Sequence, residues 1–233
     1  MIKIQGVSKS FKGTLALQNL NLSVEEGEIY GLLGANGAGK STTINMLLGF
    51  LQPDKGSVKI QDSETYQKSD EIRKLIGYIP ENVNLYPYLS GIENLDYFCR
   101  LANLKYTKLQ LHDFLNNCGL AEEAHKKRVS DYSKGMRQKV GIAIAYAKKA
   151  KVYLLDEPAS GLDPLASNEL SQLLKKLASE GATILMASHD IFRVREVCNR
   201  IGILKKGEMV KELESIEVTT TELEHLYLQF MQK

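Results

Sequence analysis

The sequence predicts an α/β fold with a mainly parallel core sheet, and three features support this prediction. Apolar and polar residues alternate near residues 2–7 and 20–24, as in antiparallel strands with one face exposed to solvent. Short apolar stretches then recur along the chain, and segments with helical periodicity separate the later ones, as in a parallel sheet covered by helices. These stretches, which we expect to be buried strands, are residues 29–33, 76–79, 152–155 and 183–187.

Turn signals mark the borders of the early strands. Glu26-Gly27 leads into the strand at residues 29–33, and Pro53-Asp54-Lys55-Gly56 precedes a short strand that contains Val58 and Ile60. Residues 91–128 contain no clear strand and therefore predict helices joined by loops. This order puts a helical insert near the middle of the chain.

Helices and a hairpin are predicted in the second half of the chain. Residues 135–150 carry Ala, Ile and Val at helical density, and Lys206-Gly207 between two apolar stretches predicts a hairpin. Thr221 and Glu224 fit a capping box that would begin a last helix. Two helices are expected to bury one apolar face each. These faces are Leu170, Leu173, Leu174 and Leu177, and then Leu223, Leu226, Tyr227 and Phe230.

Composition excludes several classes of protein. The 233 residues are 43% hydrophobic and 25% charged, which excludes a disordered, collagen-like or disulfide-stapled chain. The formal net charge of +2 provides no strong field for nucleic acid, so we expect no nucleic-acid partner. The longest stretch without Asp, Glu, Lys or Arg is residues 41–53, shorter than the roughly 20 residues of a membrane span. The start lacks the pattern of a secretory signal, and three widely spaced cysteines suit free thiols in a reducing cytosol.

A phosphate-binding loop follows the predicted strand at residues 29–33. Gly34-Ala35-Asn36-Gly37-Ala38-Gly39-Lys40-Ser41 fits G-x-x-x-x-G-K-[ST] and opens a helical stretch, which is the context that the motif requires. Glycines let backbone N–H groups converge on phosphate oxygens, Lys40 neutralises phosphate charge, and Ser41 can ligate Mg²⁺. The alternative is a simple glycine-rich turn between strand and helix. The residues expected to contact the nucleotide are Gly34, Asn36, Gly37, Ala38, Gly39, Lys40, Ser41 and Thr42.

Two adjacent carboxylates end the predicted strand at residues 152–155. In P-loop enzymes a strand-end aspartate holds Mg²⁺, which is the role expected for Asp156, and Glu157 could polarise an attacking water as general base. The alternative is two solvated acids. About 110 residues separate Lys40 from Asp156, so a large insert lies between them. No N-K-x-D base reader of a GTPase is found, whereas a small-molecule kinase stays open on these two motifs alone.

With these motifs the sequence resembles the nucleotide-binding subunit of ABC transporters over nearly its whole length. Five further elements match in order: Phe11, Glu81 in Ile79-Pro80-Glu81, the signature segment Tyr132-Ser133-Lys134-Gly135-Met136-Arg137-Gln138, the aspartate loop Ser160-Gly161-Leu162-Asp163, and His189 in Ser188-His189-Asp190. Each has a local alternative as well. Ser133 suits a helix N-cap, Asp163 before Pro164 does too, and Phe11 and His189 could serve packing or structure.

The resemblance implies a P-loop NTPase of ABC type. Its mixed core sheet would be joined by an N-terminal antiparallel β subdomain and an inserted helical subdomain. Residues 1–233 would form one ATPase domain. Residues 1–81 and 152–233 would be the ATP-binding core, and about 82–151 the helical subdomain that ends in the signature helix.

The resemblance also implies roles for single residues, with ATP as substrate and Mg²⁺ as its metal. Phe11 would stack on adenine, Asp156 and Ser41 would serve Mg²⁺, Glu157 would activate water, and His189 would contact the γ-phosphate. Two subunits would pair head to tail around two ATP molecules, as a homodimer or a heterodimer. Ser133 and Gly135 of one subunit would then complete the partner's site, with Asp163 and Glu81 as further nucleotide-site residues.

A separate transmembrane permease is the other implied partner, which would hold the chain at the cytoplasmic face of the cell membrane. The signature carries Tyr132, Lys134 and Met136 where L-S-G-G-Q is usual, and Glu81 replaces the usual glutamine. These departures resemble the branch that exports drugs, antibiotics, lipids or sodium. An importer ATPase and a soluble ABC-type ATPase, such as an iron–sulfur assembly partner, remain alternatives.

Overall fold

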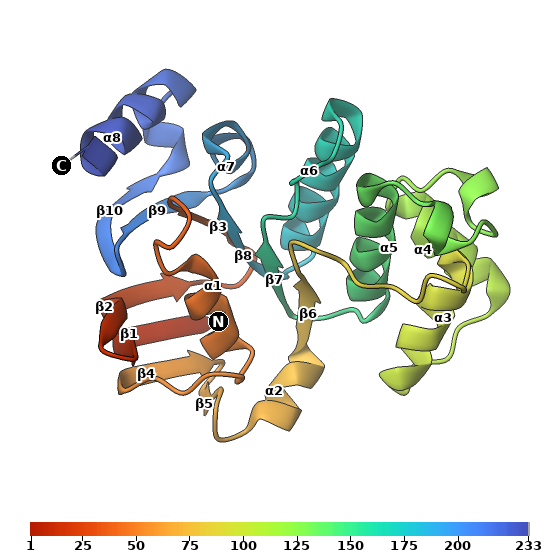
Figure 1. The fold of residues 1–233 in the computed structure, drawn as a ribbon, viewed down its shortest axis with the longest axis horizontal. Helices are drawn as coiled ribbons and strands as arrows, with labels where there is room; N and C mark the ends of the chain where they lie inside the picture. Colours follow the sequence, from red (N-terminus) through yellow and green to blue (C-terminus); the bar gives the residue numbers. More distant parts are fainter. Residues whose placement is uncertain (233) are drawn as a thin grey trace.

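Two β-sheets organise the chain in the computed structural model, which describes residues 1–232 (Figure 1). The smaller sheet is antiparallel, with the strand order β2-β1-β4-β5, and Ile2 lies opposite both Val24 and Ile60. The alternation of apolar and polar residues predicted β1 and β2, and the turn before Val58 and Ile60 predicted β4, whereas the two-residue β5 was not predicted. The strands are β1 (Ile2–Phe11), β2 (Thr14–Val24), β4 (Lys55–Ile60) and β5 (Ser63–Glu64).

The larger sheet has the strand order β10-β9-β3-β8-β7-β6. All neighbours in it run parallel except β10, which pairs antiparallel with β9 in the predicted hairpin. The predicted mixed core sheet is therefore confirmed. Its strands are β3 (Ile29–Leu33), β6 (Ile76–Ile79), β7 (Val152–Asp156), β8 (Thr183–Ser188), β9 (Arg200–Lys205) and β10 (Glu208–Glu214).

Helices connect and cover these strands. Figure 1 shows α3, α4 and α5 grouped at one side of the molecule, with the antiparallel sheet at the other. No helix within residues 1–232 is both long and apolar enough to cross a membrane. The helices are α1 (Lys40–Leu47), α2 (Ser69–Leu75), α3 (Gly91–Leu101), α4 (Lys108–Asn117), α5 (Lys134–Ala147), α6 (Pro164–Ser179), α7 (Ile191–Val197) and α8 (Thr220–Gln232), with the 3₁₀ turns η1 (Glu122–Ala124), η2 (Val129–Asp131) and η3 (Ser215–Glu217).

The core sheet separates two hydrophobic cores. Tyr30 and Leu32 of β3 face the first core, where α1 packs between the core sheet and the antiparallel sheet. Ile29 and Leu33 face the second core, which the helices from α3 to α8 fill. Alternate residues of one short strand thus serve both cores, which explains why that strand reads as a continuous apolar run. Leu223 of α8 is fully buried in the second core, as its predicted face requires.

The structure corrects one predicted helix start and adds two short helices. The capping box of α8 is formed by Thr219 and Glu222, not by Thr221 and Glu224: Glu222 N donates to Thr219 Oγ1 at 3.2 Å, and Thr219 N donates to the Glu222 carboxylate at 2.7 Å. Three consecutive threonines, residues 219–221, span the start of this helix, so two Thr–Glu pairs have the same spacing, and the earlier pair forms the cap. Helices α2 and α7, each of seven residues, were not predicted from the sequence.

Candidate active site

The carboxyl ends of three neighbouring parallel strands meet at one edge of the core sheet. Leu33 of β3 pairs with Ser188 of β8, and Asp156 of β7 pairs with Ala187. Backbone bonds continue this alignment past the strands, because Gly34 N donates to Ser188 O at 3.2 Å and Glu157 N donates to Ala187 O at 2.9 Å. The phosphate loop follows β3, Glu157 follows β7 and His189 follows β8, so all three lie next to each other at the carboxyl ends of these strands. Ligand sites of open α/β sheets lie at such edges.

The phosphate loop is shaped by its glycines. Gly39 caps the amino end of α1 with φ of 112° and supplies no side chain to bond the first N–H groups of the helix. A Cβ at Gly39 would lie 2.8 Å from Ala16 O and 2.7 Å from Leu17 Cδ2, so no larger residue fits. Gly37 has φ of 79° and faces open space. The amino end of α1 is thus left available to an anion, which helix N–H groups and the helix dipole favour.

Lys40 lies beneath this loop with only 6% of its side chain exposed. Its Nζ donates to Gly34 O at 2.6 Å and to Ala35 O at 3.3 Å, and lies 3.4 Å from Glu157 Oε1. Two backbone carbonyls and one carboxylate therefore compensate the buried cation. The ammonium is held where the loop converges, which is the position a phosphate-binding lysine needs.

Glu157 has the most constrained side chain of the site. Its φ of +48° belongs to the left-handed region, an uncommon conformation for a residue with a side chain, and such strain clusters at functional sites. Its Oε2 accepts from Ser188 Oγ at 3.1 Å and from His189 N at 3.4 Å, and lies 2.9 Å from His189 Nδ1. Its Oε1 is buried and accepts no hydrogen bond from the residues that the structure describes. One carboxylate oxygen is thus fixed by the protein, and the other is left for a ligand or for Lys40.

Asp156 stands beside Glu157 and is half-buried. Burial raises the pKa of its carboxyl above the usual value, while a hydrogen bond from Ser41 and the charge of Lys40 act in the opposite direction. Asp156, Ser41 and Glu81 line one cleft of about 170 Å³. The remaining lining residues are Ala16, Ala35, Asn36, Gly37, Gly39, Lys40, Thr42 and Glu157. The structure therefore brings most of the predicted nucleotide-binding residues into a single cleft.

A second group of predicted residues gathers elsewhere. Ser133 caps α5 through a bond from Met136 N to its Oγ at 3.2 Å, and Asp163 caps α6 through a bond from Ala166 N at 2.8 Å. A Cβ at Gly135 would lie 3.5 Å from Leu162 Cδ2, so the signature segment and the aspartate loop are neighbours. None of Ser133, Gly135 and Asp163 lines the cleft of Asp156, and both predicted N-caps are confirmed.

Phe11 also lies outside the cleft lining. It ends β1 with 47% of its surface exposed, and Lys9 Nζ lies 5.8 Å from the centre of its ring. Sequence reasoning missed Ala16 as a lining residue and Ser188 as the hydroxyl that orients Glu157. Ser188 could have been found from its place at the end of an apolar strand, whereas nothing local marks Ala16.

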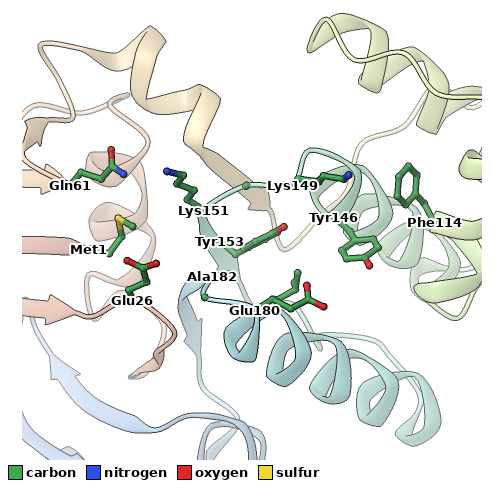
Figure 2. A pocket seen from close by; sticks show the side chains of 13 residues that line it. Met1, Glu26, Gln61, Phe114, Tyr146, Lys149, Lys151, Tyr153, Glu180 and Ala182 are labelled. Atoms are coloured by element: carbon green, nitrogen blue, oxygen red, sulfur yellow. The ribbon is translucent and has the colours of Figure 1, made fainter.

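A cavity of about 470 Å³, larger than the cleft, lies away from the phosphate loop and Asp156 (Figure 2). Lys151 and Ala182, which precede β7 and β8, line it together with Phe114 of α4 and Tyr146 of α5. It therefore lies at the amino ends of these strands, opposite the edge that carries Asp156. Its volume exceeds that of the cleft, but no phosphate-loop residue reaches it.

Comparison with known proteins agrees with this geometry. A family model described as ABC transporter matches residues 17–160. The bacitracin transport ATP-binding protein BcrA of Bacillus licheniformis is 35% identical over 91% of this chain and 69% of its own length. The lantibiotic transport ATP-binding protein SrtF of Streptococcus pyogenes is 35% identical over 92% of this chain and 91% of its own length.

Solved structures also match the fold of this chain. A dimeric ATP-binding cassette, described in a post-hydrolysis state with ADP and Pi, superposes with a TM-score of 0.85 at 31% identity, over 92% of this chain and 99% of that one. The predicted family and fold are confirmed, and the protein is an ATPase. With its P-loop, strand-end carboxylates and matching relatives, the chain belongs to the ATP-binding subunits of ABC transporters.

Proposed function

We propose that the chain hydrolyses ATP in the cleft between its phosphate loop and the end of β7, with Glu157 as general base. The position of Glu157 carries this proposal. Its carboxylate is buried at a strand end, Lys40 Nζ lies 3.4 Å from Oε1, and His189 Nδ1 lies 2.9 Å from Oε2. A fixed carboxylate with one oxygen free of hydrogen bonds can accept a proton from an attacking water. His189, whose side chain is 61% exposed, would contact the γ-phosphate from the same side.

The phosphates of ATP would be held by the phosphate loop and Lys40. The amino end of α1 supports this role, because Gly39 leaves its N–H groups without a side-chain cap. Phe11 would stack on the adenine, since it is an exposed aromatic ring at the end of β1. Phe11→Leu should then weaken ATP binding more than Phe11→Tyr does. Equal affinities would remove Phe11 from the site.

Mg²⁺ would be held by Ser41 and Asp156. Mg²⁺ is usually bound through one or two carboxylates together with substrate phosphates. The Ser41 hydroxyl and the Asp156 carboxylate line one cleft and suit this kind of coordination. When bound, the metal would neutralise part of the negative charge on the phosphates of ATP. Glu81 is exposed and lines the same cleft, so it would couple nucleotide binding there to the permease.

A second subunit would complete the site. Ser133 and Gly135 stand at the amino end of α5, and Ser133 is exposed there, so they are available to a nucleotide bound by a partner. The partner would be a second copy or a related subunit. Asp163 would act from the adjacent aspartate loop. Mixing Ser133→Arg subunits with Lys40→Ala subunits should restore one intact composite site in each mixed dimer, and absence of any gain over the separate variants would contradict this arrangement.

The dimer would drive a separate transmembrane permease, so that the chain works at the inner face of the cell membrane. The helical subdomain, about residues 82–151, would move against a core formed by residues 1–81 and 152–233. Export is the favoured direction, because BcrA and SrtF are named for the transport of bacitracin and lantibiotics. A peptide antibiotic is therefore the substrate class proposed for the permease.

Phosphate release by the purified chain tests the ATPase core of this proposal. The wild type should release phosphate from ATP with Mg²⁺ without any acceptor molecule, and Lys40→Ala should not. Phosphate transfer only in the presence of an acceptor would instead make the chain a kinase. For the coupling role, Glu81→Gln should keep the ATP affinity and change the turnover that the co-purified permease stimulates. Loss of ATP binding would make Glu81 a nucleotide ligand instead.

A further inference from the structure

Lys134 fills the position in the signature segment where the family pattern has glycine, and its side chain has a defined partner. Its Nζ donates to Ser160 Oγ at 3.1 Å. Its stem covers Gly161, because a Cβ at Gly161 would lie 2.8 Å from Lys134 Cδ. Gly161 has φ of 77°, so the aspartate loop turns sharply beneath the lysine. The first residue of α5 is thus both bonded to and packed on the aspartate loop.

The same loop is bonded to the segment that carries the proposed base. Ser160 N donates to Glu157 O at 3.0 Å, and Leu162 N donates to Ala159 O at 3.1 Å, so two successive turns join Glu157 to Asp163. The hydroxyl of Ser160 accepts from Lys134, while its backbone bonds to Glu157. A continuous chain of contacts therefore runs from Lys134 through Ser160 to Glu157.

These contacts join residues that would act on two different nucleotides. The signature segment and aspartate loop would serve the nucleotide of the partner, whereas Glu157 would serve the nucleotide of its own subunit. We propose that Lys134 is a positioning residue that locks the signature segment to the aspartate loop, so that both approach the partner's nucleotide as one rigid unit. This inference rests on the composite site of the proposed function. It assigns to Lys134 a role that a glycine at this position could not perform, since glycine offers neither a donor nor a stem.

The expected effect appears in dimer assembly and not in nucleotide binding by a single subunit. Lys134→Met keeps the stem and removes the donor, and Ser160→Ala removes the acceptor. Each should raise the subunit concentration needed for half-maximal ATP hydrolysis by about fivefold to tenfold, the cost of one typical intramolecular hydrogen bond. The affinity of dilute subunits for a fluorescent ATP analogue should stay at the wild-type value, and the melting temperature should fall by no more than about 2–4 °C. Lys175→Met, at an exposed lysine of α6, is the matched control and should change none of these.

A double-mutant cycle separates this contact from general damage. If the Lys134–Ser160 bond is the cause, the double variant Lys134→Met/Ser160→Ala should be no worse than either single variant. The proposal would be overturned if the two single effects on the half-maximal subunit concentration multiplied in the double variant. It would also be overturned if Ser160→Ala left that concentration unchanged. A loss of nucleotide affinity that matches the loss of activity would overturn it as well.

Mixed dimers test in which direction Lys134 acts. In the first mixture, Lys134→Met subunits meet excess Lys40→Ala subunits, so the working nucleotide faces a wild-type signature segment. In the second, wild-type subunits meet excess Lys40→Ala/Lys134→Met subunits, so the working nucleotide faces the altered one. The second should be slower by the fivefold to tenfold expected above, and a slower first mixture would overturn the proposal. If ATP hydrolysis per subunit of the wild type does not depend on subunit concentration, the proposal of a composite site is wrong, and the proposed role of Lys134 is wrong with it.

Discussion

Lys40 Nζ lies 3.4 Å from Glu157 Oε1, and the two side chains are only 6% and 11% exposed. The cation expected to hold phosphate and the carboxylate expected to activate water therefore compensate each other's charge. A phosphate oxygen that binds Lys40 has to compete with this carboxylate and with Gly34 O, which accepts from Nζ at 2.6 Å. Phosphate binding would then release Glu157 Oε1 for its role as a proton acceptor. Substrate binding and activation of the proposed base would thus be linked through one pair of atoms, Lys40 Nζ and Glu157 Oε1.

Removal of Lys40 should destabilise the protein as well as abolish ATP binding. Lys40→Met leaves the buried Glu157 carboxylate without its cation, so we expect the free energy of unfolding to fall by about 1–3 kcal/mol in urea titrations without nucleotide. Lys40→Met/Glu157→Gln should recover part of this loss, because a neutral amide costs less to bury than a charge. A double variant that is no more stable than Lys40→Met would contradict the ion pair.

Replacement of the proposed base should separate ATP binding from turnover. Glu157→Gln keeps the shape of the side chain and its bond from Ser188 Oγ, but it cannot take up a proton. We expect kcat for phosphate release to fall by about a hundredfold or more, with little change in KM. Glu157→Asp, which shortens the side chain but keeps the carboxylate, is the matched variant and should retain more activity. Wild-type turnover by Glu157→Gln would assign the base elsewhere.

His189 should affect the chemical step more than ATP binding. Its Nδ1 lies 2.9 Å from Glu157 Oε2, while Ser188 Oγ donates to the same oxygen at 3.1 Å. His189→Ala removes both the orienting contact and the proposed γ-phosphate contact, so kcat should fall by about 10²-fold at unchanged ATP affinity. Ser188→Ala removes only the orienting contact, and its loss should be smaller. The same loss in both variants would show that His189 acts only by holding Glu157.

The pKa of Asp156 predicts a conflict between stability and function. Because burial raises this pKa, the folded chain holds the Asp156 proton more tightly than the unfolded chain does. The contribution of this group to stability is therefore present at low pH and is lost as the pH rises through the raised pKa. Without nucleotide at pH 7, Asp156→Asn should increase the free energy of unfolding by about 0.5–2 kcal/mol.

Two further measurements sharpen this prediction. The advantage of Asp156→Asn should fade as the pH falls below about 4, where aspartate is itself neutral. The variant should also lose the stabilisation that ATP with Mg²⁺ gives the wild type. Asp113→Asn, at an exposed aspartate of α4, is the control and should leave stability unchanged. A destabilised Asp156→Asn at pH 7 would mean that the charge is fully compensated in the folded chain.

Strands buried on both faces were the easiest elements to predict. Residues 29–33 and 76–79 match β3 and β6 to the residue, and each is a short apolar run followed by a strand-ending residue, Gly34 or Pro80. Helix α2 escaped prediction because it is seven residues long and Ile72 is its one fully buried hydrophobic side chain. Its Asp70 and Arg73, suited to the helix dipole at opposite ends, are the signal that could have identified it.

The site was predictable in its composition but not in its contacts. The phosphate-loop motif and the strand-end position of Asp156 and Glu157 predict the members of the candidate site. Close approach of a phosphate to the backbone favours glycine, and Mg²⁺ binding and proton transfer favour carboxylates. The bond from Lys134 to Ser160 joins residues 26 positions apart, and no local pattern encodes it. The ion pair of Lys40 with Glu157 likewise depends on how β3 and β7 flank β8 in the sheet.

The shared nucleotide site is tested most directly by the mass of Glu157→Gln with ATP and Mg²⁺, measured by size exclusion with light scattering. Slow hydrolysis should trap the dimer that forms the composite site, so we expect a particle of twice the 26.0 kDa of one chain. Glu157→Gln/Ser133→Arg should remain a single chain under the same conditions. A Glu157→Gln protein that binds ATP and still has the mass of one chain would contradict the shared site.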